Sequence, residues 1–134
     1  MTTSPGTQPR KIVHDNLRLV DAPAKDRFEL YQDRPDTDDS VFIGFIGYRM
    51  ADEDPSVYVL QHTIVAEQYG RQGYARALTT LVLEHLAKRE QKFTTQCSYI
   101  VDYLRRYPEY LHLVTNPGAH HRSSRNKEHD HNFH

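Results

Sequence analysis

Cysteine is scarce in this sequence, because Cys97 is the only one among 134 residues. No disulfide can form within the chain, and the cysteine framework of small secreted domains is missing. We therefore expect a reducing, cytoplasmic location. A redox protein that resolves its own oxidised thiol would need a second cysteine, which counts against that class.

Long apolar runs and an excess of one charge are also missing. No segment approaches the roughly 18 apolar residues of a membrane span. The opening residues, MTTSPGTQPRK, lack the apolar core of a secretory signal. The 17 lysines and arginines nearly balance 18 aspartates and glutamates. The composition predicts no membrane partner and no nucleic-acid partner, which normally needs a basic patch.

The two ends of the chain differ from its middle. Residues 1–10 are polar with two prolines, and residues 115–134 are polar and hold five of the nine histidines. Both ends therefore predict disorder, and residues 11–114 predict one compact domain. A disordered histidine-rich tail has no preformed coordination geometry, so we predict no metal site.

Three segments have the β-branched and aromatic composition of strands, namely 26–33, 40–50 and 56–65. The turns between them are rich in aspartate and proline, which predicts an antiparallel meander. Gly44 and Gly47 interrupt the second strand and indicate a bulge. Residues 11–20 fit either a further short strand or a leading segment.

Helical spacing of apolar residues predicts a long helix over 72–88. Residues 91–100 return to strand composition, and short helical segments are expected at 102–107 and 109–114. A strand after a crossover helix can pair in parallel with the strand at 56–65. The order predicts a single α/β (α+β) domain with a mixed, mostly antiparallel sheet and flanking helices.

The glycine loop Gly70-Arg71-Gln72-Gly73 lies between the third predicted strand and the long helix. The first turn of a helix has unpaired N–H groups, and the helix dipole favours an anion there. Glycine permits a sharp turn and close approach of a ligand, and Arg71 and Arg76 suit phosphate. The loop either binds pyrophosphate or only closes a strand–helix turn under solvated arginines.

Two common nucleotide-binding loops are absent from the sequence. There is no G-x-x-x-x-G-K-[ST] for a nucleoside triphosphate and no G-x-G-x-x-G. A dinucleotide site also normally opens a doubly wound sheet, whereas this loop follows a meander. A pyrophosphate at this loop would therefore belong to another class of ligand.

The segment GRQGYA resembles the pyrophosphate-loop signature of GNAT acetyltransferases, R/Q-x-x-G-x-G/A, with Gly73 and Ala75 at its last two fixed positions. The arginine or glutamine usual at the first position is replaced by Gly70, and the arginine follows one place later. The resemblance therefore depends on the backbone of the loop more than on one arginine.

Further motifs resemble the small YjdJ-type GNAT-like N-acetyltransferase family. That family shows H-T-x-V before the loop and C-x-Y-x-x-x-Y after the next strand. Here these are HTIV at 62–65 and CSYIVDY at 97–103, followed by YPEY at 107–110. Tyr107 stands where a histidine is usual. The similarity covers residues 27–114, so it extends over the whole predicted domain.

The resemblance implies a GNAT-like fold whose parallel strand pair splays around acetyl-coenzyme A, the expected cosubstrate. Its pantetheine arm would pair with the backbone near Ile64 and Val65. Its pyrophosphate would contact the loop and the first helical turn, namely Gly70, Arg71, Gln72, Gly73, Tyr74, Ala75 and Arg76.

Three residues are candidates for the chemistry of acetyl transfer. His62 is a candidate base, since histidine titrates near neutral pH, or an ordinary strand histidine. Tyr103 stands where GNAT enzymes often have the acid for the coenzyme thiolate, or it only packs. Cys97 could act as a nucleophile that carries the acetyl group, or it is a small buried thiol.

The resemblance implies acetyl transfer to an unidentified amine, either a small molecule or a protein. The alternative is a non-catalytic module that binds coenzyme A or presents a surface to a protein partner. The acidic turns at 33–39 and 52–54 would attract a cationic amine, although solvated turns explain them as well. An exposed sheet edge could pair between chains, so monomer and homodimer both stay open.

Overall fold

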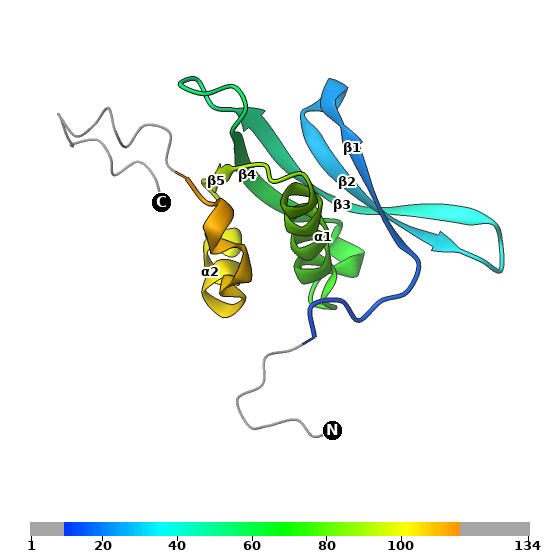
Figure 1. Ribbon diagram of the computed structural model, residues 1–134. Coiled ribbons are helices and arrows are strands. Elements are labelled where there is room, and N and C mark those ends of the chain that lie inside the picture. Colours follow the sequence, from blue (N-terminus) through cyan, green and yellow to red (C-terminus); the bar gives the residue numbers. More distant parts are fainter. Residues whose placement is uncertain (1–9, 116–134) are drawn as a thin grey trace.

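The structure is a computed structural model that describes residues 10–115 (Figure 1). Its strands are β1 (Leu17–Ala22), β2 (Arg27–Arg34), β3 (Asp39–Met50), β4 (Tyr58–Val65) and β5 (Phe93–Thr95). Its α-helices are α1 (Tyr74–Lys88) and α2 (Ser98–Arg106). Three 3-10 helices complete it, η1 (Pro23–Lys25), η2 (Glu67–Tyr69) and η3 (Pro108–Leu113). The predicted leader and tail lie outside the described residues, except for Arg10 and Thr115.

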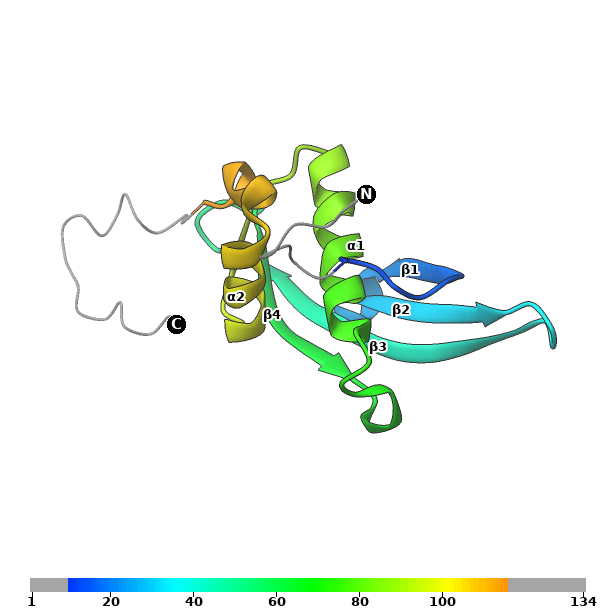
Figure 2. The same ribbon diagram turned by 90° about the horizontal axis from the view of Figure 1, so that it is seen from below.

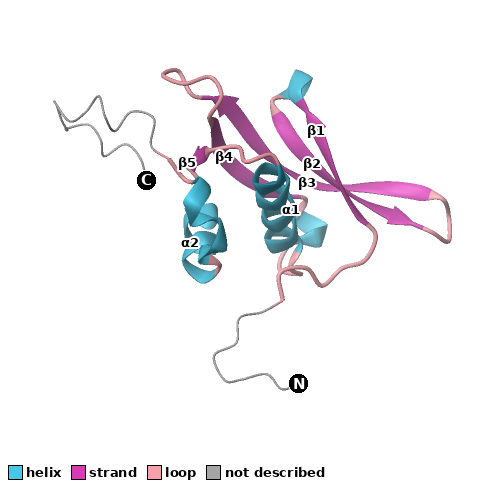
Figure 3. Ribbon diagram, in the orientation of Figure 1, coloured by secondary structure: helices cyan, strands magenta, loops and turns pink. Residues whose placement is uncertain are grey.

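The five strands form one sheet in the order β1-β2-β3-β4-β5. The first four are antiparallel neighbours, and β5 pairs in parallel with β4 after the α1 crossover (Figure 3). This confirms the predicted meander followed by a parallel pair. The uncertain segment at 11–20 contains the start of β1, and residues 10–16 lead into that strand.

Both α-helices lie on one face of the sheet. In Figure 2, seen from below, α1 and α2 cross in front of the strands. The core between these layers is formed by fully buried side chains from both: Phe28, Leu30, Ile46, Leu60, Leu78, Val82, Leu86, Phe93 and Ile100. Each such side chain contributes roughly 1.5–3 kcal/mol relative to an exposed one. Burial of its apolar face against the sheet, more than helix propensity, therefore stabilises α1.

The sheet has two bulges beside the glycines of β3. The register shifts next to Gly44, with Ile43 as the extra residue, and next to Gly47, where Gln61 of β4 is the extra residue. Glycine is required at Gly44, since a Cβ there would lie 2.3 Å from the carbonyl oxygen of Ile64. The predicted bulge is therefore confirmed, and it falls where β4 enters the candidate site.

The predicted bounds of three elements were wrong. The long helix begins at Tyr74 rather than Gln72, because Gly73 has a left-handed φ of 90° that cannot continue a helix. The second helix begins at Ser98 rather than Asp102, and the strand expected over 91–100 is only Phe93–Thr95. The backbone N–H of Cys97 donates to Thr95 Oγ1 at 3.0 Å, and such local bonds compete with strand pairing.

None of the helices within residues 10–115 has the length and apolar character that a membrane crossing requires.

Candidate active site

Pairing between β4 and β5 ends where β4 passes its bulge, and we call the unpaired stretch beyond it the gap. The two strands pair only at Tyr58, Val59 and Leu60. Among the described residues, no strand pairs with this edge of β4 from His62 to Val65. Parallel strands that separate leave unpaired backbone groups along the gap. The backbone of Ile64 and Val65, predicted to meet pantetheine, lies along this open stretch.

Cys97 lies at the closed end of the gap. It is half-buried and occupies the N-cap position of α2. Its Sγ lies 3.6 Å from Thr63 Oγ1, the hydroxyl of the facing strand. The thiol is thus placed between β4 and the first turn of α2, where a group bound in the gap would meet it.

The glycine loop leads directly into α1. Gly73 is the N-cap residue, and no side chain caps the helix. No side chain therefore hydrogen-bonds its first N–H groups, as an anion site requires. Tyr74 supplies only its backbone there, because its side chain is buried and its hydroxyl donates to Gln32 Oε1 at 2.7 Å.

The two loop glycines have different roles. Gly70 is extended, with φ −68° and ψ 151°, so its conformation suits any residue. Arg71 instead takes a positive φ of 62°, and its side chain is exposed. Gln72 is also exposed and donates to the Gln68 carbonyl at 3.1 Å. Of the two glycines, only Gly73 adopts the left-handed conformation that most side chains avoid.

Arg76 is the arginine closest to the helix N-terminus. A Cβ added to Gly73 would lie 3.1 Å from its guanidinium, so this cation lies over the loop. Arg76 also lines a cleft of about 150 Å³ between α1 and α2, together with Tyr99, Asp102, Tyr103, Arg106 and Tyr107. The cleft extends the candidate phosphate site toward α2.

Tyr103 packs between the two helices. Its side chain is buried, and its hydroxyl lies 2.7 Å from Thr80 Oγ1. Thr80 Oγ1 already donates to the Arg76 carbonyl at 2.8 Å. The Thr80 hydroxyl therefore lies within hydrogen-bond distance of both the Arg76 carbonyl and the Tyr103 hydroxyl. Burial raises the pKa of Tyr103 well above its ordinary value, so the phenol stays protonated at neutral pH.

His62 lies apart from the other two catalytic candidates. Its side chain is exposed and rests against Gly47 and the edge of Phe45, with ring centroids 6.3 Å apart. Thr63, the next residue, contacts Cys97 on the helix side of β4. The structure therefore brings Cys97 and Tyr103 to the helix side, and leaves His62 on the opposite face of the strand.

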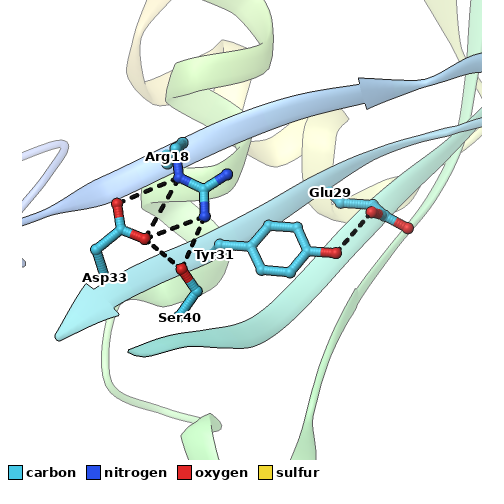
Figure 4. A network of polar contacts seen from close by, with 5 residues as sticks. All are labelled: Arg18, Glu29, Tyr31, Asp33 and Ser40. Carbon is cyan, nitrogen blue, oxygen red and sulfur yellow. Dashed lines mark hydrogen bonds and ion pairs between the residues drawn. The ribbon is translucent and has the colours of Figure 1, made fainter. Parts of the chain in front are cut away.

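The uncovered sheet face carries paired charges, of which Figure 4 shows a network. Arg18 binds Asp33 at 3.0 Å, and Ser40 donates to the same carboxylate. The hydrogen bond from Arg18 holds the pKa of Asp33 below its usual range. One carboxylate of the predicted acidic turn is thus already paired with an arginine of this chain.

Glu29 is the buried carboxylate of the same face. It accepts from Arg27 Nε at 2.8 Å and from the Tyr31 hydroxyl at 2.9 Å, and Arg27 covers the ring of Phe45 at 4.3 Å. Burial alone would raise the pKa of Glu29, but the bonds from Arg27 and Tyr31 bring it below its ordinary value. Glu29 is therefore an ionised structural group.

Sequence reasoning missed the polar partners of the site, Thr63, Thr80, Tyr99 and Arg106. Tyr99, Tyr103 and Arg106 follow i, i+4, i+7 spacing on one helix face, a signal that was hidden because α2 was predicted to begin at Asp102. Within residues 10–115, no three histidine, cysteine or acidic side chains are grouped to hold a metal ion.

The comparisons with known proteins agree with this geometry. The solution structure of a GCN5-like candidate N-acetyltransferase from Staphylococcus aureus has a TM-score of 0.51 and 22% identity. The match covers 90% of this chain and 100% of that one, and it shows the shared fold. A search of curated protein sequences finds no match.

A family model described as GCN5-related N-acetyl-transferase matches residues 27–113. The match includes the glycine loop, the open stretch of β4, Cys97 and Tyr103. It does not separate the YjdJ-type subfamily from its relatives, so that finer assignment stays a prediction. The chain belongs to the GCN5-related N-acetyltransferase family.

Proposed function

We propose that this protein is an acetyl-coenzyme A-dependent N-acetyltransferase that acts on an amine. The observation that carries the proposal is the gap between β4 and β5, which opens beside the uncapped N-terminus of α1. A strand edge with unpaired backbone groups suits an amide-bearing arm such as pantetheine. A helix N-terminus with Arg76 over it suits pyrophosphate.

The proposed seat of the coenzyme follows from these two features. Pyrophosphate is bound by the N–H groups from Gln72 to Arg76, with Arg76 as the nearest cation and Arg71 exposed at the rim. Pantetheine pairs with the β4 backbone at Ile64 and Val65. This arrangement brings the thioester toward Cys97 and Thr63 at the closed end of the gap.

Acetyl transfer requires three events at the thioester. The amine nitrogen bonds to the acetyl carbon, the carbon–sulfur bond breaks, and the coenzyme thiolate takes a proton. Tyr103 is the proposed proton donor, once its hydroxyl leaves Thr80. His62 is the proposed acceptor of the amine proton. Because His62 lies on the other face of β4, the amine would approach from the uncovered sheet face.

Cys97 offers a second route within the same proposal. Its sulfur would attack the thioester carbonyl, hold the acetyl group and release the coenzyme thiol, and the amine would then take the acetyl group from Cys97. A Cys97→Ala variant separates the two routes. It stops turnover if the acetyl group passes through the cysteine, and it preserves much of the turnover if transfer is direct.

The alternative is a module that binds coenzyme A without turnover. It is favoured by the burial of the Tyr103 hydroxyl against Thr80 and by the separation of His62 from Cys97. The two functions differ in one measurement, the release of coenzyme thiol from acetyl-coenzyme A in the presence of amines.

The deciding experiment screens a panel of small amines, polyamines and lysine peptides for amine-dependent thiol release. We expect turnover by the wild type and a loss of about 100-fold in kcat for Tyr103→Phe, the size of a lost general acid. Tyr58→Phe is the matched control, since Tyr58 packs in the same core. Coenzyme binding without thiol release for any amine would favour the binding module instead.

A further inference from the structure

The residues before β1 lie across the candidate coenzyme site. We call residues 10–14, with the sequence RKIVH, the N-terminal strap. In Figure 2 the dark blue segment that contains them crosses α1 on its way to β1. The family match begins at residue 27, so the strap lies outside the part of the chain that the family describes.

The strap contacts the residues that would cradle pyrophosphate. His14 Nε2 lies 2.6 Å from the Gln72 carbonyl oxygen, and the His14 ring stacks on Tyr74 at 3.8 Å. Val13 covers Gly73, since its Cγ2 would lie 3.4 Å from a Cβ added there. The loop surface that must stay open for a phosphate is therefore occupied by the chain itself.

The strap also engages the arginine of the site. Arg76 Nε donates to the Arg10 carbonyl at 2.8 Å. The Nε–H of Arg76 is thus used by the strap and is not free for a bidentate contact with phosphate. Binding of pyrophosphate would thus have to replace this bond as well as the cover over Gly73.

Lys11 attaches the strap to η3. Its ammonium forms an ion pair with Glu109 and donates to the Tyr110 hydroxyl at 3.0 Å. It also lies over the rings of Tyr110 and Tyr107, at 4.8 and 5.6 Å from their centroids. Burial opposes the charge on Lys11, but the bond to Glu109 raises its pKa, so the ammonium is kept.

Through these contacts the strap connects the glycine loop to η3. We propose that the N-terminal strap is an autoinhibitory segment that occupies the coenzyme groove in the free protein and leaves the glycine loop when acetyl-coenzyme A binds. This inference rests on the proposed function, because it takes the glycine loop as the pyrophosphate seat. Lys11 attaches the strap to η3, mainly through its ion pair with Glu109.

Limited trypsin digestion of the full chain tests the strap directly, because Arg10 and Lys11 are themselves cleavage sites. Cleavage of a locally opened segment follows the population of the open form. We expect acetyl-coenzyme A to accelerate cleavage after Arg10 and Lys11, while cleavage after Arg89, at the far end of α1, keeps its rate. Mass spectrometry of the fragments assigns each site.

A Glu109→Gln variant removes the ion pair between Lys11 and Glu109 and leaves the glycine loop unchanged. It should be cleaved faster than the wild type at Arg10 and Lys11 without coenzyme, and it should bind acetyl-coenzyme A more tightly. If the strap closes ~90% of the molecules, the gain in affinity is at most about tenfold. Asp54→Asn, which removes a carboxylate that binds Ser56 in a distant turn, should change neither quantity.

The outcomes separate this inference from the proposed function. If acetyl-coenzyme A raises the unfolding midpoint but cleavage of the strap stays constant or slows, the autoinhibitory strap is wrong and the coenzyme site stands. If Glu109→Gln binds coenzyme when the wild type does not, both are supported. If neither protein binds it, both are overturned.

Discussion

Arg71 carries the clearest backbone strain in the glycine loop. A non-glycine residue in the left-handed region costs roughly 1–2 kcal/mol, and Arg71 has a φ of 62°. We predict that the free energy of unfolding is about 1 kcal/mol higher for Arg71→Gly than for Arg71→Ala. Urea titration of both variants measures this difference.

Arg89 provides the control for that pair, since it is also exposed and has an ordinary φ of −98° at the end of α1. There the order should reverse, with Arg89→Ala more stable than Arg89→Gly. The same order at both positions would mean that glycine relieves no strain at Arg71.

Glu29 gives a residue-level prediction that depends on pH. Replacing it by glutamine leaves Arg27 without its anionic partner and should lower the free energy of unfolding by about 1–2 kcal/mol at pH 7. The folded-state pKa of Glu29 is below its unfolded value of ~4.3. Its stabilisation is therefore present above that pH and disappears as the pH falls through the folded-state pKa.

The measurement is chemical denaturation of wild type and Glu29→Gln from pH 3 to pH 7. The two curves should converge at the acid end. Tyr31→Phe, which removes one neutral donor to the same carboxylate, should cost less than Glu29→Gln at neutral pH. A gap between wild type and Glu29→Gln that is constant with pH would show that Glu29 is not ionised in the fold.

At the level of elements, a buried polar contact between Thr80 and Tyr103 joins α1 and α2. Thr80→Val and Tyr103→Phe each remove one hydroxyl while keeping the shape of the side chain. A double-mutant cycle should give a coupling free energy of about 0.5–1.5 kcal/mol. Thermal or urea unfolding of the four proteins provides the values.

Thr79 is the matched control, because its hydroxyl bonds the Ala75 carbonyl at 2.9 Å and is fully buried. Thr79→Val and Tyr103→Phe should be additive. Coupling as large for Thr79 as for Thr80 would mean that the cycle reports repacking of α1 rather than the hydroxyl contact.

The elements also show where sequence reasoning succeeds. Alternation in the segment from Phe28 to Gln32 and the helical spacing of Leu78 and Val82 predict β2 and α1, because burial of one face enforces both periods. The start of α2 was missed, because the bond from Cys97 N–H to Thr95 Oγ1 ends β5 early. A single side-chain bond of this kind leaves no periodic signal.

For the whole molecule, the order of strands and the crossover could be predicted from the sequence. Which candidate residues come together beside β4 could not. The separation of His62 from Cys97 depends on the extra residue Gln61, which decides the side of β4 on which each following side chain lies. The strap was equally hidden, because Lys11 and Glu109 lie 98 positions apart. Neither residue has a local pattern that indicates the contact.

The central claim is that the glycine loop binds the pyrophosphate of acetyl-coenzyme A. Thermal unfolding with and without this ligand tests it in the wild type, Gly73→Asn and Gly73→Asp. Asparagine and aspartate both tolerate the left-handed conformation that Gly73 adopts. They have nearly the same shape, so the pair isolates the effect of one negative charge at the loop.

Ligand at ~100 times its Kd should stabilise the folded wild type by about 2.7 kcal/mol. We predict a clear rise of the unfolding midpoint for the wild type, a smaller rise for Gly73→Asn, and the smallest for Gly73→Asp. No rise for the wild type at saturating acetyl-coenzyme A, or an equal rise for all three proteins, would contradict a pyrophosphate seat at Gly73.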